Sequence, residues 1–584
     1  MRGLTAANAI ANTSSTSSPV SVSSTTGTAS GSRSGYADNG IPRVGQVIGK
    51  DTGILGTTFD HSARGTVAGG RGMVAAGHPL AAGVGLQALA RGGNAFDAAV
   101  AMAAAIAVVE PAMNSIGGDA FAIVKSPDSA QPQAFNSSGP APAAARARDY
   151  GERIAPEGLA AATIPAAVRL WEQLHGEFGR LKWADLLAPA IEFADRGVPV
   201  SQLLAGHIQA NRNSLARFPD SARTYLPGGA PLRAGETLWQ RPLARTLAEV
   251  SERGAVGLAE GSFAGALEAY ARDLGLAHRR SDFQLLRCDR LAPLSTPYLG
   301  RTVWVQPPVS QGYVTLAALA IADLAGAGEL EYSDPVRVHI AIEAKKQAFQ
   351  LRHRFLGDPD LAGASSAEIL DGDLLAASAA RIDHTRAARH AIPEPLPVGS
   401  DTTCLAAADA EGNSVAYIQS IFAAFGSRAM VPGTGVMMNN RMTGFSLDPR
   451  HPNFLRGGRR PVHTLMTWMV TDAELPVAFG STAGGHYQVQ TNQQVIDNHL
   501  RFGMDLQRAL EAPRWGHDET SGDVYVEERF GAPMAATLRT LGHEAAGAGL
   551  WGAGSRGLAI GRDPASGNLW GASDPRWHGV AIGF

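Results

Sequence analysis

Two adjacent threonines, Thr402 and Thr403, follow a proline-rich segment and begin a stretch of strand-like sequence. A hydroxyl nucleophile needs a base that takes its proton. A threonine at a new chain end carries its own base, because its α-amino group has a pKa of about 7.7–8.0 and is partly neutral near neutral pH. Such a site requires cleavage of a precursor before the threonine. Taken alone, two threonines at the start of a strand fit ordinary β-propensity at least as well.

A second candidate is the pair Gly484 and Gly485, which lies between a strand-like and a helix-like stretch. Backbone N–H groups near the start of a helix, without bulky side chains around them, suit a developing oxyanion. The segment lacks the Lys-Ser/Thr ending of a P-loop and does not match the dinucleotide-binding fingerprint. A tight turn from strand to helix explains the two glycines equally well.

The elements that would position these residues fall into two regions. Up to about residue 390 the sequence favours helices, and only 120–124 indicates a strand. The predicted helices are 80–91, an apolar and therefore buried helix at 95–109, 166–177, 183–194, 314–324 and 335–349.

Strands dominate after the proline-rich segment 392–398, which is hostile to helices. Residues 403–408 and 414–420 predict a hairpin whose turn contains Gly412 and Asn413. Further strands are predicted at 436–439, 465–471 and 476–479, and a helix at 488–502.

Composition limits the classes of function. The 584 residues carry 50 Lys and Arg against 53 Asp and Glu, a net charge of −3, which excludes a globally basic nucleic-acid binder. The two cysteines, Cys288 and Cys404, allow neither a disulfide framework nor a cysteine-based zinc site. No carboxylate pair and no cluster of His, Asp and Glu indicates a metal, and we expect no cofactor.

Residues 1–43 form a Ser/Thr-rich tail that is predicted to be disordered. The longest apolar stretches, 98–109 and 314–321, are shorter than the roughly 18 residues that a membrane span needs, and no secretory signal pattern is present. We therefore expect a soluble, cytoplasmic protein with no membrane partner.

Seven segments together resemble the γ-glutamyltransferase (glutathione hydrolase) family, from about Gly72 to the C-terminus. They are Gly-Met-Val-Ala-Ala-Gly-His-Pro-Leu-Ala at 72–81, Gly-Gly-Asn-Ala-Phe-Asp-Ala-Ala at 92–99, Glu-Pro at 110–111 with Gly-Gly-Asp-Ala-Phe at 117–121, Glu-Ala-Lys at 343–345 with Gly-Asp-Pro at 357–359, Asp-Thr-Thr at 401–403, Asp-x-x-Gly-Asn at 409–413, and Gly-Ala-Ser-Asp-Pro-Arg at 571–576.

This resemblance implies an α/β (α+β) protein with the four-layer αββα sandwich of N-terminal-nucleophile hydrolases. The family is made as a proenzyme, which here implies cleavage between Asp401 and Thr402 into a large chain, 44–401, and a small chain, 402–584, of one folded domain. Thr402 would attack a substrate amide and form an acyl-enzyme, which water or an amine resolves. Ser420 falls where the family has a threonine that hydrogen-bonds the nucleophile, and Gly484 and Gly485 fall on the oxyanion glycines.

Several positions that grip the substrate in glutathione-cleaving members differ here. In those members an arginine and a Ser-Ser pair bind the substrate α-carboxylate. Here Asn136 stands at the arginine position, and His463-Thr464 stand at the Ser-Ser position. Around the substrate α-ammonium, an aspartate, an asparagine and a glutamine are replaced by Gly444, Phe422 and Arg441 respectively.

A site without an acidic partner for the ammonium, and with Arg441 nearby, predicts a small-molecule amide whose acyl group has a carboxylate and no α-amine. This pattern resembles the branch with cephalosporin acylases and oxamate amidohydrolase. His463 fits contact with a substrate carboxylate or a hydrogen bond to a backbone carbonyl. Two alternatives stay open: a γ-glutamyl hydrolase or transferase, and an unprocessed, inactive binding protein.

Overall fold

The computed structural model describes residues 64–360, 366–389 and 401–584. The predicted disordered tail, 1–43, and the proline-rich segment 392–398 lie outside the described residues. In the described part of the chain, no helix combines the length and apolar character that crossing a membrane would require.

Two antiparallel sheets of seven strands form the centre of the described structure. The first sheet has the order β19 (Val580–Gly583), β2 (Gly72–Ala76), β10 (Asp401–Asp409), β11 (Ser414–Phe422), β3 (Asp119–Lys125), β4 (Gln133–Ser137) and β7 (Asp289–Leu291). The second has the order β1 (Val67–Gly69), β18 (Leu569–Ser573), β17 (Arg556–Arg562), β13 (Leu475–Ala483), β12 (Thr467–Asp472), β9 (Arg301–Val305) and β8 (Leu294–Tyr298).

The two sheets pack face to face through small and apolar side chains. Successive side chains of a strand point to opposite faces, so Cys404 and Ala406 of β10 lie in the core between the sheets, together with Phe479 of β13. Leu405 and Ala407 point the other way, into a core shared with helices. Both faces of β10 are therefore buried, which fits its nearly continuous apolar sequence.

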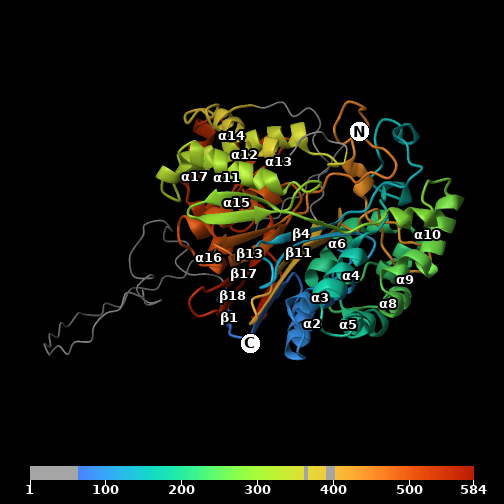
Figure 1. The fold of residues 1–584 in the computed structure, drawn as a ribbon. Coiled ribbons are helices and arrows are strands. Elements are labelled where there is room, and N and C mark those ends of the chain that lie inside the picture. The colour runs from blue at the N-terminus through green and yellow to red at the C-terminus, as the bar shows by residue number, and fades with distance from the viewer. Residues whose placement is uncertain (1–63, 361–365, 390–400) are drawn as a thin grey trace, which may run out of the picture. The chain divides into compact units, whose positions relative to one another are not determined.

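Helices cover the outer face of each sheet (Figure 1). The first sheet packs against α2 (Pro79–Ala90), α3 (Ala95–Val109) and α4 (Ala167–Phe178), and α5 (Trp183–Arg196) packs on α3. The second packs against α11 (Gly312–Leu324) and α15 (Tyr487–Leu500), and α12 (Pro335–Phe355) packs on α11. The layers are thus helix, sheet, sheet and helix, which confirms the predicted αββα class.

The remaining elements extend these layers. They are the helices α6 (Gln202–Leu215), α7 (Pro219–Tyr225), α8 (Arg241–Arg253), α9 (Ala255–Glu260), α10 (Ser262–Asp273), α13 (Ser366–Ile369), α14 (Gly372–Ala379), α16 (Leu506–Glu511) and α17 (Pro533–Thr540), a small sheet of β14 (Trp515–His517), β15 (Asp523–Val526) and β16 (Glu544–Gly547), and the pair β5 (Val198–Pro199) and β6 (Thr237–Leu238).

The predicted helices and the 403–420 hairpin are confirmed, with α12 extending to Phe355. Two expectations are wrong. Residues 436–439 join neither large sheet and make only isolated bridges within the described structure, to Gly117 and Met430. The predicted strand at 120–124 is confirmed as β3, but the first 390 residues also contribute β1, β2, β4 and β7–β9 to the two sheets, because strands of three to five residues carry little sequence pattern.

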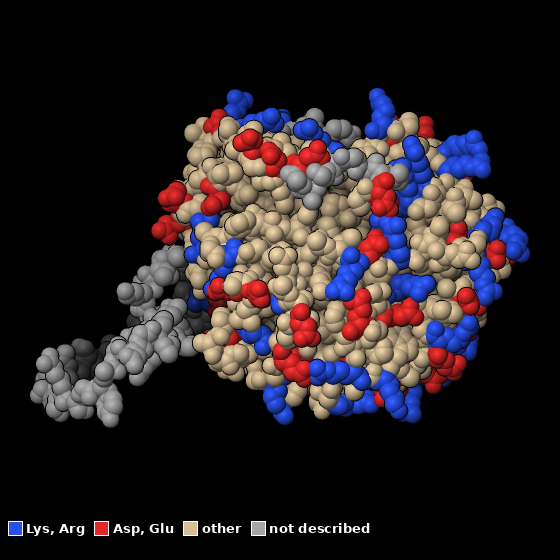
Figure 2. All heavy atoms as spheres, in the orientation of Figure 1, with Lys and Arg blue, Asp and Glu red and all other residues tan. Residues whose placement is uncertain are grey.

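Charged side chains of both signs are interspersed on the face drawn in Figure 2. This distribution follows from the nearly balanced charge of the chain. The drawn face therefore offers no extended basic patch for a phosphate backbone to follow.

Candidate active site

Thr402 lies at an irregularity between β10 and β11. Asp401 pairs with Phe422 and Thr403 pairs with Gln419, so two residues of β11, Ser420 and Ile421, stand opposite Thr402. This is a β-bulge, a device that often re-aims side chains beside active sites. Thr402 is buried, with 2% of its surface exposed.

Strand alternation separates the roles of the two threonines. Thr403 points toward the helical layer, where its Oγ1 donates a hydrogen bond to Oε2 of Glu110, at the end of α3, over 3.0 Å. Thr402 shares the opposite, inter-sheet face with Cys404, two residues further along β10. Thr402 is therefore the threonine that faces the space between the sheets.

Ser420 lies opposite Thr402 on β11 and in register with Asp119 of β3. It is fully buried, and its Oγ accepts a hydrogen bond of 2.7 Å from the Phe422 N–H. Ser420 thus places a hydroxyl on the strand next to Thr402 in the hairpin.

Gly484 and Gly485 form the turn from β13 into α15. Their φ angles are +138° and +56°, in the region that favours glycine. A Cβ on Gly484 would lie 2.6 Å from Oγ of Ser555. The Gly484 and Gly485 carbonyls accept from Tyr487 N–H and Gln488 N–H, which fixes the turn at the start of α15. The pair therefore sits at a helix N-terminus at the end of a central strand, the setting predicted for an oxyanion site.

A cluster of buried polar side chains lies at the end of the first sheet that carries Thr402 and Ser420. Asn136 and Ser138 lie on and just beyond β4, on the same face as Phe121 of β3, whose ring lies 4.9 Å from that of His463. Oγ of Ser138 and Nε2 of His463 are 2.8 Å apart. We call Asp119, Asn136, Ser138, Arg441 and His463 the acyl-pocket cluster.

Arg441 enters the acyl-pocket cluster from a 3₁₀-helix, η6 (Arg441–Gly444). Its guanidinium carbon lies 4.6 Å from the centre of the Phe422 ring, and its Nε lies 3.5 Å from Oδ2 of Asp119. Oδ1 of Asp119 accepts a hydrogen bond of 2.6 Å from Gly139 N–H, and Nε2 of His463 lies 4.0 Å from Oδ2.

Several buried polar atoms of the cluster have no hydrogen-bond partner among the described residues. They are Oδ2 of Asp119, both amide atoms of Asn136, Nε, Nη1 and Nη2 of Arg441, and Nδ1 of His463. Each of these side chains is at most 1% exposed. Since buried polar groups are normally hydrogen-bonded, this concentration in one place marks a site for a polar ligand.

Burial shifts the titration of the cluster. It raises the pKa of Asp119 to about 7, against the opposing effects of Arg441 and the Gly139 N–H. It lowers the pKa of Arg441 to about 10, which leaves the guanidinium charged at neutral pH. Burial is the main cause that lowers the pKa of His463 well below its usual value, and the charges of Arg441 and Arg460 lower it further. The imidazole is therefore neutral.

The sequence-predicted substrate residues are brought together only in part. Arg441, His463 and Asn136 meet in the cluster. Gly444 ends η6, and a Cβ built on it would lie 3.3 Å from the Val462 carbonyl oxygen. The Thr464 carbonyl oxygen accepts a hydrogen bond from Nε2 of Gln311. The backbone of Asp401 lies in β10, and its side chain is outside the description.

Gly444 supplies no carboxylate at the family's aspartate position, but Asp119 brings an acidic side chain beside Arg441 from β3. Asp119 and Ser138 are the members of the cluster that were not predicted as site residues from the sequence. The available signal for Asp119 was its place after Gly117-Gly118 at the start of an apolar strand. Its position relative to Arg441 depends on the register of β3 with β11, which no local pattern reveals.

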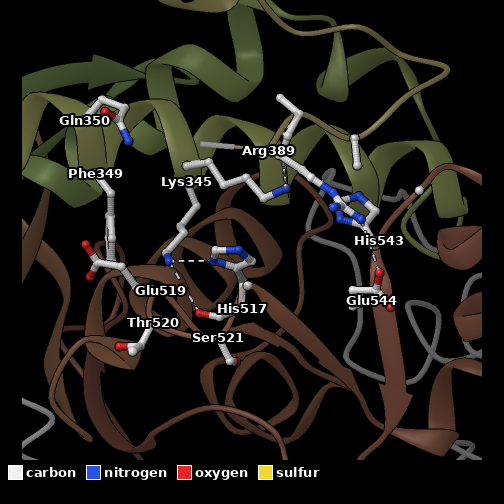
Figure 3. A pocket seen from close by; sticks show the side chains of 15 residues that line it. Lys345, Phe349, Gln350, Arg389, His517, Glu519, Thr520, Ser521, His543 and Glu544 are labelled. Carbon is white, nitrogen blue, oxygen red and sulfur yellow. Dashed lines mark hydrogen bonds and ion pairs between the residues drawn. The ribbon is translucent and has the colours of Figure 1, made fainter. Parts of the chain in front are cut away.

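A cavity of about 380 Å³ lies away from these residues, between α12, β14 and the turn before β16 (Figure 3). Figure 3 shows Lys345 and His517 pointing toward each other, and Nζ of Lys345 lies 2.9 Å from Nδ1 of His517. Burial lowers the pKa of this lysine to about 7. The residues predicted for catalysis and substrate binding do not line this cavity.

A buried group beside this cavity contains three side chains of metal-ligating type, His339, Glu343 and His543, with donor atoms within 4.8 Å of one another. The sequence analysis missed it, although His339 and Glu343 are four residues apart on α12. Nδ1 of His339 lies 2.7 Å from Nε2 of His543, and Nζ of Lys346 donates to Oε1 of Glu343 over 2.7 Å. These side chains already have partners within the protein, and Nζ of Lys346 occupies the position next to Glu343 that a metal cation would take.

The comparisons with known proteins agree with this architecture. A family model described as gamma-glutamyltranspeptidase matches residues 81–584. The chain belongs to this family. The glutathione hydrolase-like YwrD proenzyme of Bacillus subtilis (strain 168) is 35% identical over 527 residues, which cover 89% of this chain and 99% of that protein. The oxamate amidohydrolase proenzyme of Klebsiella pneumoniae subsp. pneumoniae is 34% identical over 529 residues, 88% of this chain and 98% of that one.

Among solved structures, the cephalosporin acylase from Bacillus halodurans matches with a TM-score of 0.83 at 34% identity, over 90% of this chain and 98% of that one. The resemblance drawn from the sequence motifs and the N-terminal-nucleophile hydrolase fold are both confirmed. The protein is thus a gamma-glutamyltranspeptidase-family hydrolase whose relatives include acylases and an oxamate amidohydrolase.

Proposed function

We propose that this protein is a self-processing amide hydrolase. Cleavage after Asp401 gives a large chain, 44–401, and a small chain that begins with Thr402, and the two remain one folded domain. The observation that carries the proposal is the position of Thr402, buried at a bulge on the inter-sheet face, opposite Ser420 and beside a cluster of unsatisfied polar groups. Relatives named as proenzymes support the processing step.

The proposed reaction uses groups of the chain alone. Oγ1 of Thr402 attacks the amide carbon while its proton passes to the Thr402 α-amino group. The carbonyl oxygen, which becomes negatively charged, is stabilised by the N–H groups of Gly484 and Gly485. The proton then passes to the leaving amine as the C–N bond breaks, and water hydrolyses the resulting ester of Thr402. Ser420 positions the nucleophile through its hydroxyl.

The proposed acyl group is small and carries a carboxylate. Arg441 offers three N–H-bearing nitrogens without a hydrogen-bond partner among the described residues, a set that suits a carboxylate. Asn136 and His463 of the same cluster, together with Thr464 and Gly444, are the other residues that we assign to acyl binding. Oxamate amidohydrolase and cephalosporin acylase, both similar over nearly the whole chain, are the models for this substrate class.

One alternative is favoured by a specific observation. The Bacillus subtilis relative is named glutathione hydrolase-like, and Asp119 supplies an acidic group of the kind that a γ-glutamyl ammonium needs. A γ-glutamyl hydrolase therefore stays the second candidate. The unprocessed binding protein is the third, and the experiment that follows separates it from both.

The test is the variant Thr402→Ala. Without the hydroxyl, the chain should stay uncut on a denaturing gel and should hydrolyse neither glutaryl nor γ-glutamyl 4-nitroanilide, whereas the wild type should run as two bands. Thr403→Val is the matched control, since Thr403 points to the helical layer; it should still be cut between 401 and 402, as mass spectrometry of the new N-terminus would show. Cleavage of Thr402→Ala at this bond, or an intact and inactive wild type, would overturn the proposal.

A further inference from the structure

The acyl-pocket cluster needs both hydrogen-bond donors and acceptors from its ligand. Arg441 and Nδ2 of Asn136 require acceptors, such as the oxygens of a carboxylate. Oδ1 of Asn136 requires a donor, such as an N–H group. So does Oδ2 of Asp119, which accepts no hydrogen bond from a described residue although Nε of Arg441 lies 3.5 Å away. A ligand with a carboxylate alone leaves the second set unpaired, which is costly in a buried site.

The charges of the cluster come from two side chains, Asp119 and Arg441. The groups that face Asp119 are Arg441 from η6, His463 from the segment after Pro461, the Gly139 N–H after β4 and Ser420 from β11. His463 is neutral, and Arg460, which acts on it electrostatically, is engaged by Asp289 and Asp358. With Asp119 ionised the pair has a net charge of zero, and with Asp119 protonated it has one positive charge.

These two states complement two different acyl groups. A glutaryl group brings one carboxylate and suits the state with a single positive charge. A γ-glutamyl group brings an α-carboxylate and an α-ammonium, and this zwitterion suits the state with one charge of each sign. The same pocket can thus serve both classes, depending on a single carboxyl group.

We propose that Asp119 is the residue that determines acyl specificity: its carboxylate accepts an N–H or ammonium group next to the acyl carboxylate, so the pocket admits amino-acid acyl groups as well as plain dicarboxylic ones. This inference rests on the proposed function, in that it concerns the acyl group transferred to Thr402. It goes beyond it by assigning selectivity to a residue one strand away from the nucleophile hairpin.

The experiment compares the wild type with Asp119→Asn. The asparagine keeps an oxygen that accepts from Gly139 N–H and replaces the free carboxylate oxygen with a donor. The ratio of kcat/KM for γ-glutamyl 4-nitroanilide to that for glutaryl 4-nitroanilide should fall roughly tenfold or more, since a charge-assisted hydrogen bond is lost for one substrate only. The substrates differ only in the α-amine, so effects on Thr402 cancel in the ratio. An unchanged or increased ratio would overturn the assignment.

A second arm needs no variant. Because the pKa of Asp119 is about 7, the wild-type ratio should rise between about pH 6 and about pH 8 as the carboxylate ionises, with glutaryl favoured at the acidic end. The Thr402 amine titrates for both substrates alike. A ratio that stays flat across this range would contradict the proposal even if Asp119→Asn failed to fold.

A binding measurement separates this inference from the proposed function. Calorimetric titration of the wild type with L-glutamate and with glutarate reports on the pocket without any turnover. If neither amide is hydrolysed but Asp119→Asn weakens L-glutamate relative to glutarate, the proposed reaction fails and the specificity assignment stands. If amides are hydrolysed through Thr402 but Asp119→Asn changes neither the kinetic ratio nor the binding ratio, the assignment fails and the reaction stands. Absence of binding of both acids to the wild type would also overturn the assignment.

Discussion

At the scale of single residues, the proposed site consists of buried side chains whose polar atoms have no hydrogen-bond partner among the described residues. Arg441 is 1% exposed and stacks on Phe422, yet its three guanidinium nitrogens make no hydrogen bond to a described residue. A buried guanidinium held only by a ring contact and by Asp119 at 3.5 Å is incompletely compensated. It is therefore prepared to bind an anionic group.

Removing this guanidinium should weaken the hydrolysis of carboxylate-bearing substrates. We expect Arg441→Ala to lower kcat/KM for glutaryl 4-nitroanilide roughly tenfold or more, because one charged hydrogen-bonding partner of the carboxylate is lost. Steady-state kinetics on the processed enzyme measure the effect. Arg450→Ala is the control, since Arg450 is exposed and contacts Asp448 next to it. Equal kinetics in all three proteins would show that Arg441 does not contact substrate.

Sequence reasoning found Arg441, His463 and Asn136 through their positions in a family pattern, but Asp119 escaped it. The three substituted positions stand where known substrate contacts occur, so a pattern points to them directly. Asp119 stands where no such contact was expected, and it reaches Arg441 only through the pairing of β3 with β11. Contacts made by sheet register between distant segments have no local signal, whereas the hairpin of β10 and β11 has one in its turn residues.

At the scale of elements, the turn between β13 and α15 holds the proposed oxyanion site in a conformation that few residues adopt. Gly484 has φ of +138°, and its Cα faces Ser555 closely. Helix and strand propensity predicted the two flanking elements, but the backbone geometry of the turn follows from how β13 and β17 pack, which the sequence does not encode locally.

The variant Gly484→Ala should therefore be impaired in both stability and turnover. A side chain at this φ costs on the order of 1–3 kcal/mol, and the new methyl would displace Ser555 and tilt the N–H groups of the turn. Thermal unfolding and kcat measure the two effects. Gly83→Ala serves as the comparison, because Gly83 lies within α2 with open space around it and should gain about 0.5–1 kcal/mol. A Gly484→Ala enzyme with wild-type kcat would argue against an oxyanion role.

At the scale of the whole described fold, the proposed cleavage point divides both sheets between two chains. In the first sheet β2, from the large chain, lies between β19 and β10, both from the small chain. In the second, β1 and β9 of the large chain flank four strands of the small one. Each chain thus supplies strands that the other needs as hydrogen-bonding neighbours.

Cleavage should consequently leave the two chains bound to each other. We expect them to elute together in size-exclusion chromatography at physiological salt and to separate only in denaturant, since parting them would break three strand interfaces in the first sheet and two in the second, and would expose the core between the sheets. Gel analysis of the eluted peak checks this. Elution of the 402–584 chain alone under native conditions would contradict the interleaved arrangement.

The same interleaving gives the proposed self-cleavage a further meaning. Thr402 lies on β10, which pairs with β11 on one side and on the other with β2, a segment more than 300 residues earlier in the chain. The bulge opposite Ser420 can form within the hairpin of β10 and β11, whereas only the assembled sheets bring Asp119 next to β11 and pack β10 against β13. Under the proposed self-cleavage, a cut chain is therefore one whose central sheets have assembled, and slow assembly of the first sheet should delay the cut.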